Sequence, residues 1–251
     1  MDMKTSGNHQ VITPARERYT TGSVTSTDGT LIGYRQYGCG PGLVLVQGAM
    51  GSAQNFSQLA EALSDAFTVY VPDRRGRGLS PLPYRKDHTI QRDVEDLEAL
   101  LAKTDAHHVF GLSSGAVIAL TAAIGSTVIH RLAVFEPPLF EKHPMPTAEL
   151  ARFDKAIAQG NVAAAFAAAG KAVQIAPILN YIPNWLLTFF SNRILASEDK
   201  QPQGDYLTLR ELTPALQYDL RVVSEMHGAL SRWSAIPVSY THLTLPTIYS
   251  V

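Results

Sequence analysis

The sequence predicts an α/β fold in which a mostly parallel sheet carries helices on both faces and receives a helical insertion. Short β-rich runs alternate with helical periodicity from about residue 22 to residue 140. Helical signals then take over, and a strand-like start returns at residues 235–238. We therefore divide the chain into an N-terminal arm, an α/β core, a helical cap, the start of a seventh core strand and a tail, at residues 1–21, 22–140, 141–232, 233–238 and 239–251.

The first half of the core is predicted element by element. Residues 23–30 and 31–38 form two strands around the Asp28-Gly29 turn, which favours an antiparallel hairpin. Residues 43–46 are a continuous apolar run, typical of a strand buried on both faces. A helix follows over residues 52–66, and a second buried strand over residues 67–71.

The later elements follow the same logic. An amphipathic helix is predicted over residues 90–102, then a strand at 108–110, a helix at 116–124 and a strand at 131–135 that Pro137-Pro138 ends. The most apolar stretch of the cap covers residues 173–190. Polar residues and prolines interrupt it, so it falls short of the ~20 clean apolar residues of a membrane span. We predict a buried or pocket-lining helical segment there.

Composition restricts the partners. The 251 residues are 45% hydrophobic and 17% charged, with a net charge of −1 and no basic or acidic block. This balance argues against nucleic-acid and membrane partners and favours a small-molecule substrate, and it leaves the oligomeric state open. The single Cys39 excludes an internal disulfide, and residues 1–19 lack the apolar core of a signal peptide. We expect a cytoplasmic protein.

Two glycine-rich turns contain the residues that we expect to act in catalysis. Gly111-Leu112-Ser113-Ser114-Gly115 fits G-x-S-x-G between a buried strand and an apolar helix, the context in which the central serine is a nucleophile. Residues 47–52, QGAMGS, follow the third strand and offer backbone N–H groups. A tetrahedral intermediate needs two such donors, and the natural pair is Ala49 and Ser114.

The segments VQGAMGSAQNF, VPDRRGRGLS and FGLSSGA, in this order and spacing, closely resemble the α/β-hydrolase family from about residue 22 to residue 238. The resemblance implies an eight-stranded, mostly parallel sheet with a cap after the sixth strand. Gln47 departs from it, because this family usually has histidine there, in a supporting position. We interpret residues 72–80 as a structural loop in which Asp73 and the arginines pair locally, and not as a phosphate site.

The family's triad runs in the order Ser, acid, His, and the histidine is hard to place. Five of the histidines are excluded by order or position, and two fall in the cap: His9, His88, His107, His108 and His130, then His143 and His227. His242 remains, but residues 238–251 carry neither a glycine turn nor an acid. Reverse translation of residues 238–247 resembles a mosaic-end sequencing adapter. We expect the native part of this sequence to end at Pro237. The histidine, the last strands and the final helix would then be encoded downstream of codon 237 in the natural gene.

The acid is either an aspartate after the seventh strand, as in most relatives, or Glu136 at the end of the sixth, as in haloalkane dehalogenase-like members. The resemblance implies a serine hydrolase that cleaves an ester or related acyl bond of a small apolar substrate. Ser113 attacks, and Ala49 and Ser114 hold the oxyanion, without metal or organic cofactor. A cofactor-free haloperoxidase-like enzyme and a non-catalytic binding protein of this fold are the alternatives. A dehalogenase is disfavoured because its nucleophile is aspartate. The 251-residue chain itself is expected to be inactive and poorly folded, with an open edge at the sixth strand.

Overall fold

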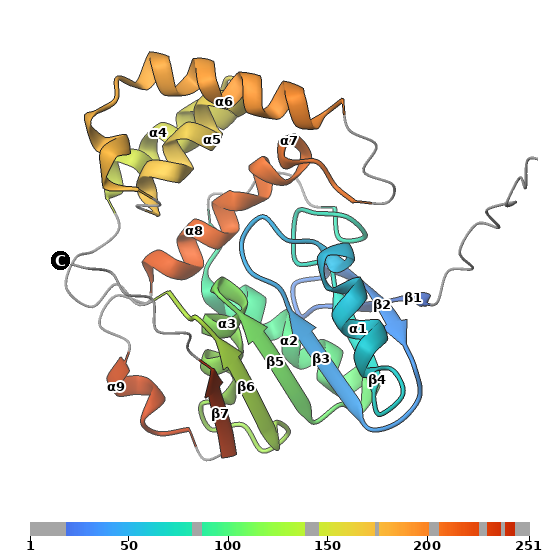
Figure 1. Cartoon of the computed structure of the whole chain (residues 1–251). Coiled ribbons are helices and arrows are strands. Elements are labelled where there is room, and N and C mark those ends of the chain that lie inside the picture. The colour runs from blue at the N-terminus through green and yellow to red at the C-terminus, as the bar shows by residue number, and fades with distance from the viewer. Residues whose placement is uncertain are drawn as a thin grey trace, which may run out of the picture.

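The computed structural model describes residues 19–81, 87–138, 146–173, 176–200, 206–225, 230–236 and 239–243 (Figure 1). Within these residues a seven-stranded sheet forms the centre, in the order β1-β2-β4-β3-β5-β6-β7. The β1–β2 and β2–β4 pairs are antiparallel and the remaining pairs are parallel. The strands are β1 Thr20–Thr25, β2 Leu31–Tyr37, β3 Gly42–Val46, β4 Thr68–Pro72, β5 His108–Leu112, β6 Arg131–Phe135 and β7 Ser239–Leu243.

Helices lie on both faces of the sheet and above the carboxyl ends of its parallel strands. Figure 1 shows α1 on one face, α2 and α3 behind the other, and α8 between the sheet and α4 to α6. The predicted α/β architecture with a helical insertion is therefore confirmed. The helices are η1 Ala53–Phe56, α1 Ser57–Leu63, α2 Ile90–Thr104, α3 Ser114–Ala123, α4 Thr147–Ala158, α5 Val162–Ala172, η2 Pro177–Tyr181, α6 Asn184–Glu198, α7 Leu209–Leu212, η3 Thr213–Ala215, α8 Leu216–Ser224 and α9 Leu230–Trp233.

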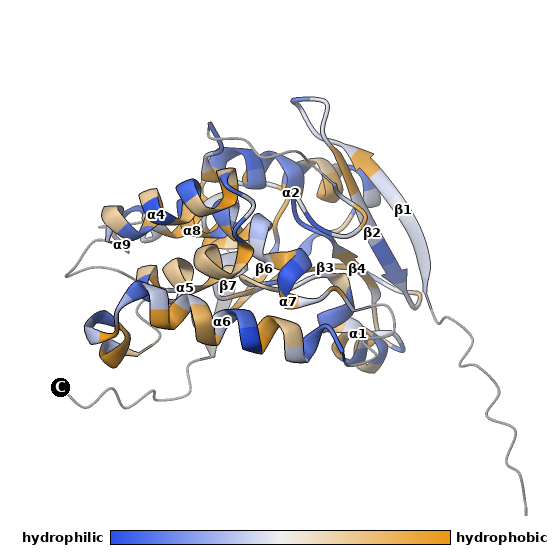
Figure 2. Ribbon diagram, turned by 90° about the horizontal axis from the view of Figure 1, so that it is seen from above, coloured by the Kyte–Doolittle hydropathy of each residue, from blue (hydrophilic) through white to orange (hydrophobic). Residues whose placement is uncertain are grey.

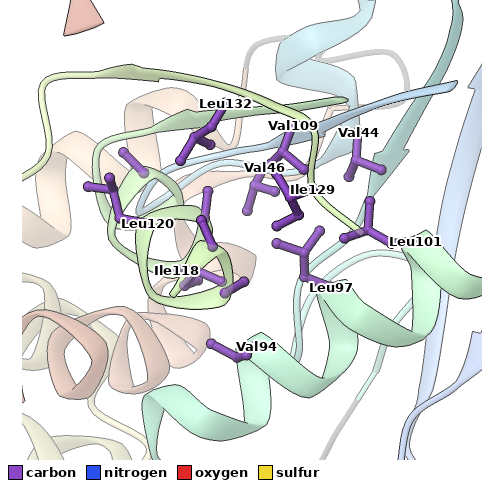
Figure 3. Close-up of a cluster of buried hydrophobic side chains, with 14 of the residues drawn as sticks. Val44, Val46, Val94, Leu97, Leu101, Val109, Ile118, Leu120, Ile129 and Leu132 are labelled. Atoms are coloured by element: carbon purple, nitrogen blue, oxygen red, sulfur yellow. The ribbon is translucent and has the colours of Figure 1, made fainter. Parts of the chain in front are cut away.

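The main core fills the space between the sheet and the helices α2 and α3. Figure 3 shows strand valines and leucines meeting the apolar side of α2 and the almost wholly apolar α3. The amphipathic pattern predicted for α2 is confirmed, because the four side chains predicted to face the sheet are buried: Val94, Leu97, Leu100 and Leu101. This packing holds β5 and α3, and therefore the turn between them, in a rigid frame.

Two element boundaries differ from the predictions near the N-terminus. β1 begins at Thr20, so the strand takes in two residues assigned to the arm. The helix expected over residues 52–66 begins as the 3₁₀ turn η1 and becomes α-helical only at Ser57. The side chain of Asn55 accepts a hydrogen bond from the backbone N–H of Ser52, which favours the tighter opening turn.

The seventh strand is not where the sequence predicted it. For residues 233–236 the expected strand start is wrong, because α9 ends at Trp233 and the backbone N–H groups of Ala235 and Ile236 donate to the carbonyls of Arg232 and Trp233. β7 lies further on and pairs in parallel with the whole of β6. The expected open edge at β6 is therefore also wrong. Residues 237–238 and 244–251 lie outside the described residues, and the adapter origin of the tail stays a prediction.

One face of the sheet carries a wide groove. It has a volume of about 750 Å³ and lies over β3, β5 and β6, beside α1. In Figure 1 the same strands face the viewer without a helix in front of β5 and β6. Its apolar lining is Leu43, Leu45, Leu59, Leu63, Val109, Phe110, Leu132 and Ala133. Among the described residues, α1 is the helix that borders this apolar surface.

Among its described residues, the apolar stretch at residues 173–190 is not buried as one of the two predicted alternatives has it, although its Asn184 and Thr188 line a pocket with residues of α4 and α5. It forms η2 and the first half of α6, and α6 lies along the outside of the cap with hydrophobic segments along its length (Figure 2). Trp185 is 72% exposed and Tyr181 is 85% exposed. No helix within the described residues combines the length and the apolar composition needed to cross a bilayer.

Candidate active site

Ser113 stands at a strained turn between β5 and α3. It precedes the first helical residue with φ 52° and ψ −120°, a backbone conformation that side-chain-bearing residues rarely adopt. Its backbone N–H donates to the carbonyl of Phe135, the last residue of β6, at 2.9 Å. The side chain is partly exposed. Such strain of about 1–3 kcal/mol persists where the surrounding fold enforces it, and it marks the predicted strand-turn-helix context of the serine.

The two glycines of the motif allow this turn to form. A Cβ on Gly115 would lie 2.3 Å from the carbonyl oxygen of Val46, and a Cβ on Gly111 would lie 2.6 Å from the Cα of Ala116. Both contacts are with backbone, which cannot move aside as a flexible side chain can. The pattern G-x-S-x-G therefore reflects the close packing of α3 against β5 and the end of β3.

The glycine-rich turn after β3 lies directly beside Ser113. A Cβ on Gly48 would stand 3.0 Å from Cβ of Ser113 and 3.6 Å from its Oγ. Ala49 follows on the exposed side, and Met50 has a positive φ of 55°. Ser114 is the first residue of α3, where backbone N–H groups have no partner within the helix. The structure thus brings the two segments that carry the predicted oxyanion donors next to Ser113.

Gln47 is held away from a catalytic role. Its Nε2 donates to the carbonyl of Pro72 at 2.6 Å, and its backbone carbonyl accepts from Arg74 Nη1 at 3.2 Å. The side chain is 1% exposed. At the position where the resemblance leads us to expect histidine, glutamine therefore joins the turn after β3 to the end of β4.

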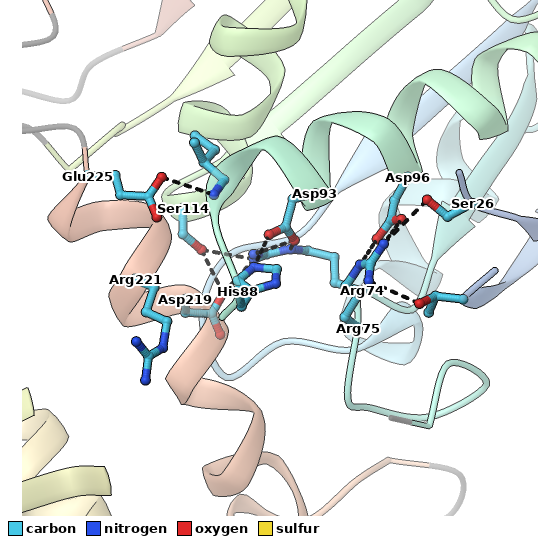
Figure 4. Close-up of polar contacts among 12 residues, drawn as sticks. Ser26, Arg74, Arg75, His88, Asp93, Asp96, Ser114, Asp219, Arg221 and Glu225 are labelled. Atoms are coloured by element: carbon cyan, nitrogen blue, oxygen red, sulfur yellow. Dashed lines mark hydrogen bonds and ion pairs between the residues drawn. The ribbon is translucent and has the colours of Figure 1, made fainter. Parts of the chain in front are cut away.

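The arginine loop after β4 is structural, but its ion pairs are not local (Figure 4). Arg75 pairs with Asp96 of α2 at 2.6 Å and with Asp28 of the first hairpin at 2.7 Å. Arg77 pairs with Asp219 of α8 at 2.9 Å. The predicted local pairing is therefore wrong, because the carboxylates come from segments far away in the sequence. Asp73 instead accepts from the backbone N–H groups of Ala53 and Leu79.

Arg74 links the turn between β5 and α3, which we call the elbow, to the ion pairs of the arginine loop. Its guanidinium contacts Asp93 of α2 at 3.2 Å, Asp219 at 2.5 Å and Oγ of Ser114 at 3.0 Å. Ser114 Oγ in turn donates to Asp219 at 3.1 Å. Ser114 therefore has buried side-chain contacts that its sequence context did not predict. A buried aspartate on a cap helix leaves no readable signal for it in the sequence.

Two carboxylates of the cluster, those of Asp219 and Asp93, stay charged although they are buried. Burial alone raises the pKa of Asp219, but the charges of Arg77 and Arg74 outweigh it and hold the pKa below its usual value. Burial acts in the same way on Asp93, where Arg74 and a hydrogen bond from His88 lower the pKa to about 2. His88 Nε2 lies 2.6 Å from Asp93 Oδ2. His88 is therefore committed to this cluster, consistent with its exclusion as the base.

Glu136 lies beside the elbow but is not tied to it. It follows Phe135, whose carbonyl receives the Ser113 N–H, and it is exposed with φ 47°. No hydrogen bond of its carboxylate was found within the described residues. Its position at the carboxyl end of β6 agrees with the sequence prediction, and its role as the acid stays a prediction.

The base histidine is not found among the described side chains. His107 and His130 stack at 4.4 Å at the opposite end of β5 and β6, as the sequence predicted. His143 and His227 lie outside the described residues, and His242 is placed only by its backbone, opposite Val134. Across the described residues, no group of three His, Cys, Asp or Glu side chains is arranged to hold a metal ion.

Comparisons with known proteins agree with this geometry. Residues 43–248 match the profile of the alpha/beta hydrolase family. The crystal structure of an alpha/beta hydrolase from Sphaerobacter thermophilus is similar over 89% of this chain and 81% of that chain, with 31% identity and a TM-score of 0.68. An N-formylmaleamic acid deformylase from Pseudomonas putida S16 has the same fold, with 20% identity and a TM-score of 0.58 over 90% of this chain and 81% of that chain.

Two curated proteins are similar over shorter segments. An uncharacterized hydrolase of Bacillus subtilis is 35% identical over 128 residues, 47% of this chain and 47% of that protein. The N-formylmaleamate deformylase of Pseudomonas putida is 34% identical over 125 residues, 48% of this chain and 47% of that protein. The chain thus spans about half the length of the curated relatives it matches.

Proposed function

This chain belongs to the alpha/beta hydrolase family, and we propose that the protein acts in it as a serine hydrolase that cleaves an acyl bond of a small, largely apolar substrate. Ser113 is the nucleophile, and the backbone N–H groups of Ala49 and Ser114 receive the oxyanion of the tetrahedral intermediate. The reaction needs no metal or organic cofactor. We also propose a cytoplasmic location, because the single Cys39 is an exposed free thiol.

One observation carries the proposal. Ser113 combines a positive φ, a position between β5 and α3, and contact with the turn at Gly48. A serine that merely opens a helix has no reason to adopt a strained backbone, whereas a nucleophile lifted above the sheet requires it. The catalytic acid is Glu136 or an aspartate beyond the described residues.

The substrate class is an acyl group on oxygen or nitrogen. Two relatives, the deformylase of Pseudomonas putida and a pyrrolizixenacetamide deacetylase of Xenorhabdus hominickii that is 36% identical over 94 residues, are named for the removal of acyl groups. The same attack of serine on a carbonyl carbon cleaves esters and amides. We therefore propose small N-acyl compounds as substrates beside simple esters.

A fluorophosphonate probe tests the proposed function. The test uses the protein translated from the genomic gene. We expect covalent labelling that Ser113→Ala abolishes, because the probe needs an activated hydroxyl. Labelling that persists in this variant would place the nucleophile elsewhere. A folded wild-type protein that resists the probe would favour the alternative of a binding protein without catalysis.

A further inference from the structure

The outer surface of the cap presents an apolar face that the proposed function does not use. Half of the large exposed hydrophobic side chains found among the described residues lie on η2 and α6. We call them the α6 face: Ile178, Tyr181, Trp185, Phe189, Phe190 and Ile194, exposed by 64%, 85%, 72%, 51%, 52% and 51%. In Figure 2, α6 runs along the outside of the molecule.

The helix α6 carries apolar side chains on its exposed side as well as on its packed side, although Asn192, Arg193 and Ser197 are exposed there too. Leu187, Ser191 and Leu195 are its buried residues, and the helix packs against α5. Trp185 and Phe189 lie one turn apart on the opposite side. A surface helix normally places charged residues there, whereas a helix that is hydrophobic all round is normally covered. The exposed apolar residues of α6 are therefore of the kind that a second surface normally covers.

The residue types on this face are those of protein interfaces. Aromatic residues and arginine are enriched in interface cores, and Lys, Asp and Glu are depleted. Arg193 is the sole charged residue between Lys171 and Glu198. Its guanidinium carbon lies 5.8 Å from the ring centroid of Phe189, so the charge rests on an aromatic surface.

Area and charge decide the occupant. The exposed parts of the six side chains amount to on the order of 700 Å², since one large aromatic side chain presents roughly 150–250 Å². A standard interface buries about 800 Å² on each partner. Lipid surfaces attract clusters of Lys and Arg, and this face offers a single arginine. In a pair of such faces the two Arg193 side chains repel each other only weakly, because Arg193 lies away from the two-fold axis.

We propose that the α6 face joins two copies of this chain in a two-fold symmetric homodimer. A two-fold axis brings the same patch of both copies together and sets the two α6 helices antiparallel. If the axis passes near Phe189, Arg193 of one copy lies toward the partner's Trp185. A cation–π contact between the two side chains would then replace the water around the guanidinium. The proposal does not depend on Ser113 or on the proposed reaction.

Sedimentation equilibrium tests the dimer. The wild-type chain is compared with Trp185→Ser/Phe189→Ser and with the matched control Leu59→Ser/Ile124→Ser, which alters two exposed apolar residues elsewhere, Leu59 in the sheet groove. Across a concentration series up to about 100 μM, we expect dimers for wild type and control and a mass lower by about half for the α6 variant. A monomeric wild type, or a dimer that survives the α6 changes, would overturn the proposal.

Crosslinking keeps the proposal testable if the double variant folds poorly. In a Cys39→Ser background, Phe189→Cys near the axis should oxidise to a disulfide-linked dimer, and Leu59→Cys should not. Equal crosslinking of both variants would contradict a specific α6 contact. In vesicle co-sedimentation with phosphatidylcholine and phosphatidylglycerol, we expect the wild-type chain to stay in the supernatant. Vesicle binding that Trp185→Ser/Phe189→Ser abolishes would assign the face to a lipid surface and overturn the homodimer.

Discussion

Arg74, on the loop after β4, and Asp219, on α8, form a buried ion pair with Nη1 2.5 Å from Oδ1. Their side chains are 5% and 2% exposed. Asp219 also accepts from Arg77 and from Oγ of Ser114. The arginine loop, the helix α3 and the helix α8 therefore meet at one carboxylate.

Asp219→Ala should strongly destabilise the fold. The change leaves Arg74 and Arg77 buried with less compensating charge, and breaking a buried pair costs about 3–5 kcal/mol. Asp154→Ala is the matched control, because its pair with Arg221 is 32% and 25% exposed and such pairs contribute about 1 kcal/mol or less. Urea unfolding measures both. Similar losses in the two variants would contradict the assigned importance of the buried cluster.

Stability should fall with acidification through Asp93. Its native pKa of about 2 lies below the value of about 3.9 for an unfolded aspartate. The depressed native pKa means that the unfolded chain binds the proton first, so the stabilisation is complete above about pH 4 and is lost as the pH falls toward 2. Urea midpoints from pH 6 to pH 2.5 should decline more steeply for the wild type than for Asp93→Asn. Parallel curves would show that Asp93 does not contribute to the acid sensitivity.

Gly115→Ala should be far more damaging than Gly160→Ala. A methyl group at residue 115 meets the carbonyl of Val46 at 2.3 Å, so α3 or β3 must shift at a cost of about 3 kcal/mol. Gly160 also has a positive φ, but nothing lies within 4 Å of its added Cβ, so alanine costs about 1 kcal/mol there. Thermal melts of the two variants separate the effects. Equal melting temperatures would mean that the elbow has more space than its backbone distances indicate.

In the protein from the genomic gene, Ser113→Ala should reduce turnover, whereas Ser114→Ala should mainly reduce stability. Loss of the nucleophile lowers the turnover of p-nitrophenyl esters by about 10³-fold or more and leaves the melt unchanged. Ser114→Ala keeps the backbone N–H but removes hydroxyl contacts to Arg74 and Asp219, so it costs about 1–2 kcal/mol of stability while most turnover remains. Equal loss of turnover in both variants would count against the elbow assignment.

Local chemistry explains what the sequence could predict. The Asp28-Gly29 turn located the first hairpin, and Pro137 and Pro138 ended β6 where expected. The motif around Ser113 was recognisable because its fixed residues lie within five positions, although a Cβ on Gly115 would meet the backbone of the distant Val46. The partners of the arginine loop could not be found in this way. Asp219 lies more than 140 residues from Arg74, and nothing in the sequence of α8 distinguishes it from a solvated aspartate.

Hydrophobicity led to two wrong predictions, the burial of residues 173–190 and the position of the seventh strand. Residues 173–190 are apolar, and apolarity predicts that a segment is covered without saying by what. We predicted that the rest of this chain would bury the segment, whereas Trp185 and Tyr181 are largely exposed. The seventh strand was misplaced for a related reason. The apolar Ala235 and Ile236 suggested a strand, but the end of α9 binds their N–H groups first.

Met50, in the turn after β3, has a side chain that packs against the hydrophobic cluster of the cap, which includes Phe153 and Leu220. Its neighbour Ala49 is one of the two proposed oxyanion donors. If the cap swings outward as a rigid body, Met50 must either lose its apolar contacts or pull the turn with it. An outward movement of the helices that contact Met50 would therefore change both the access to Ser113 and the position of the proposed oxyanion donor Ala49.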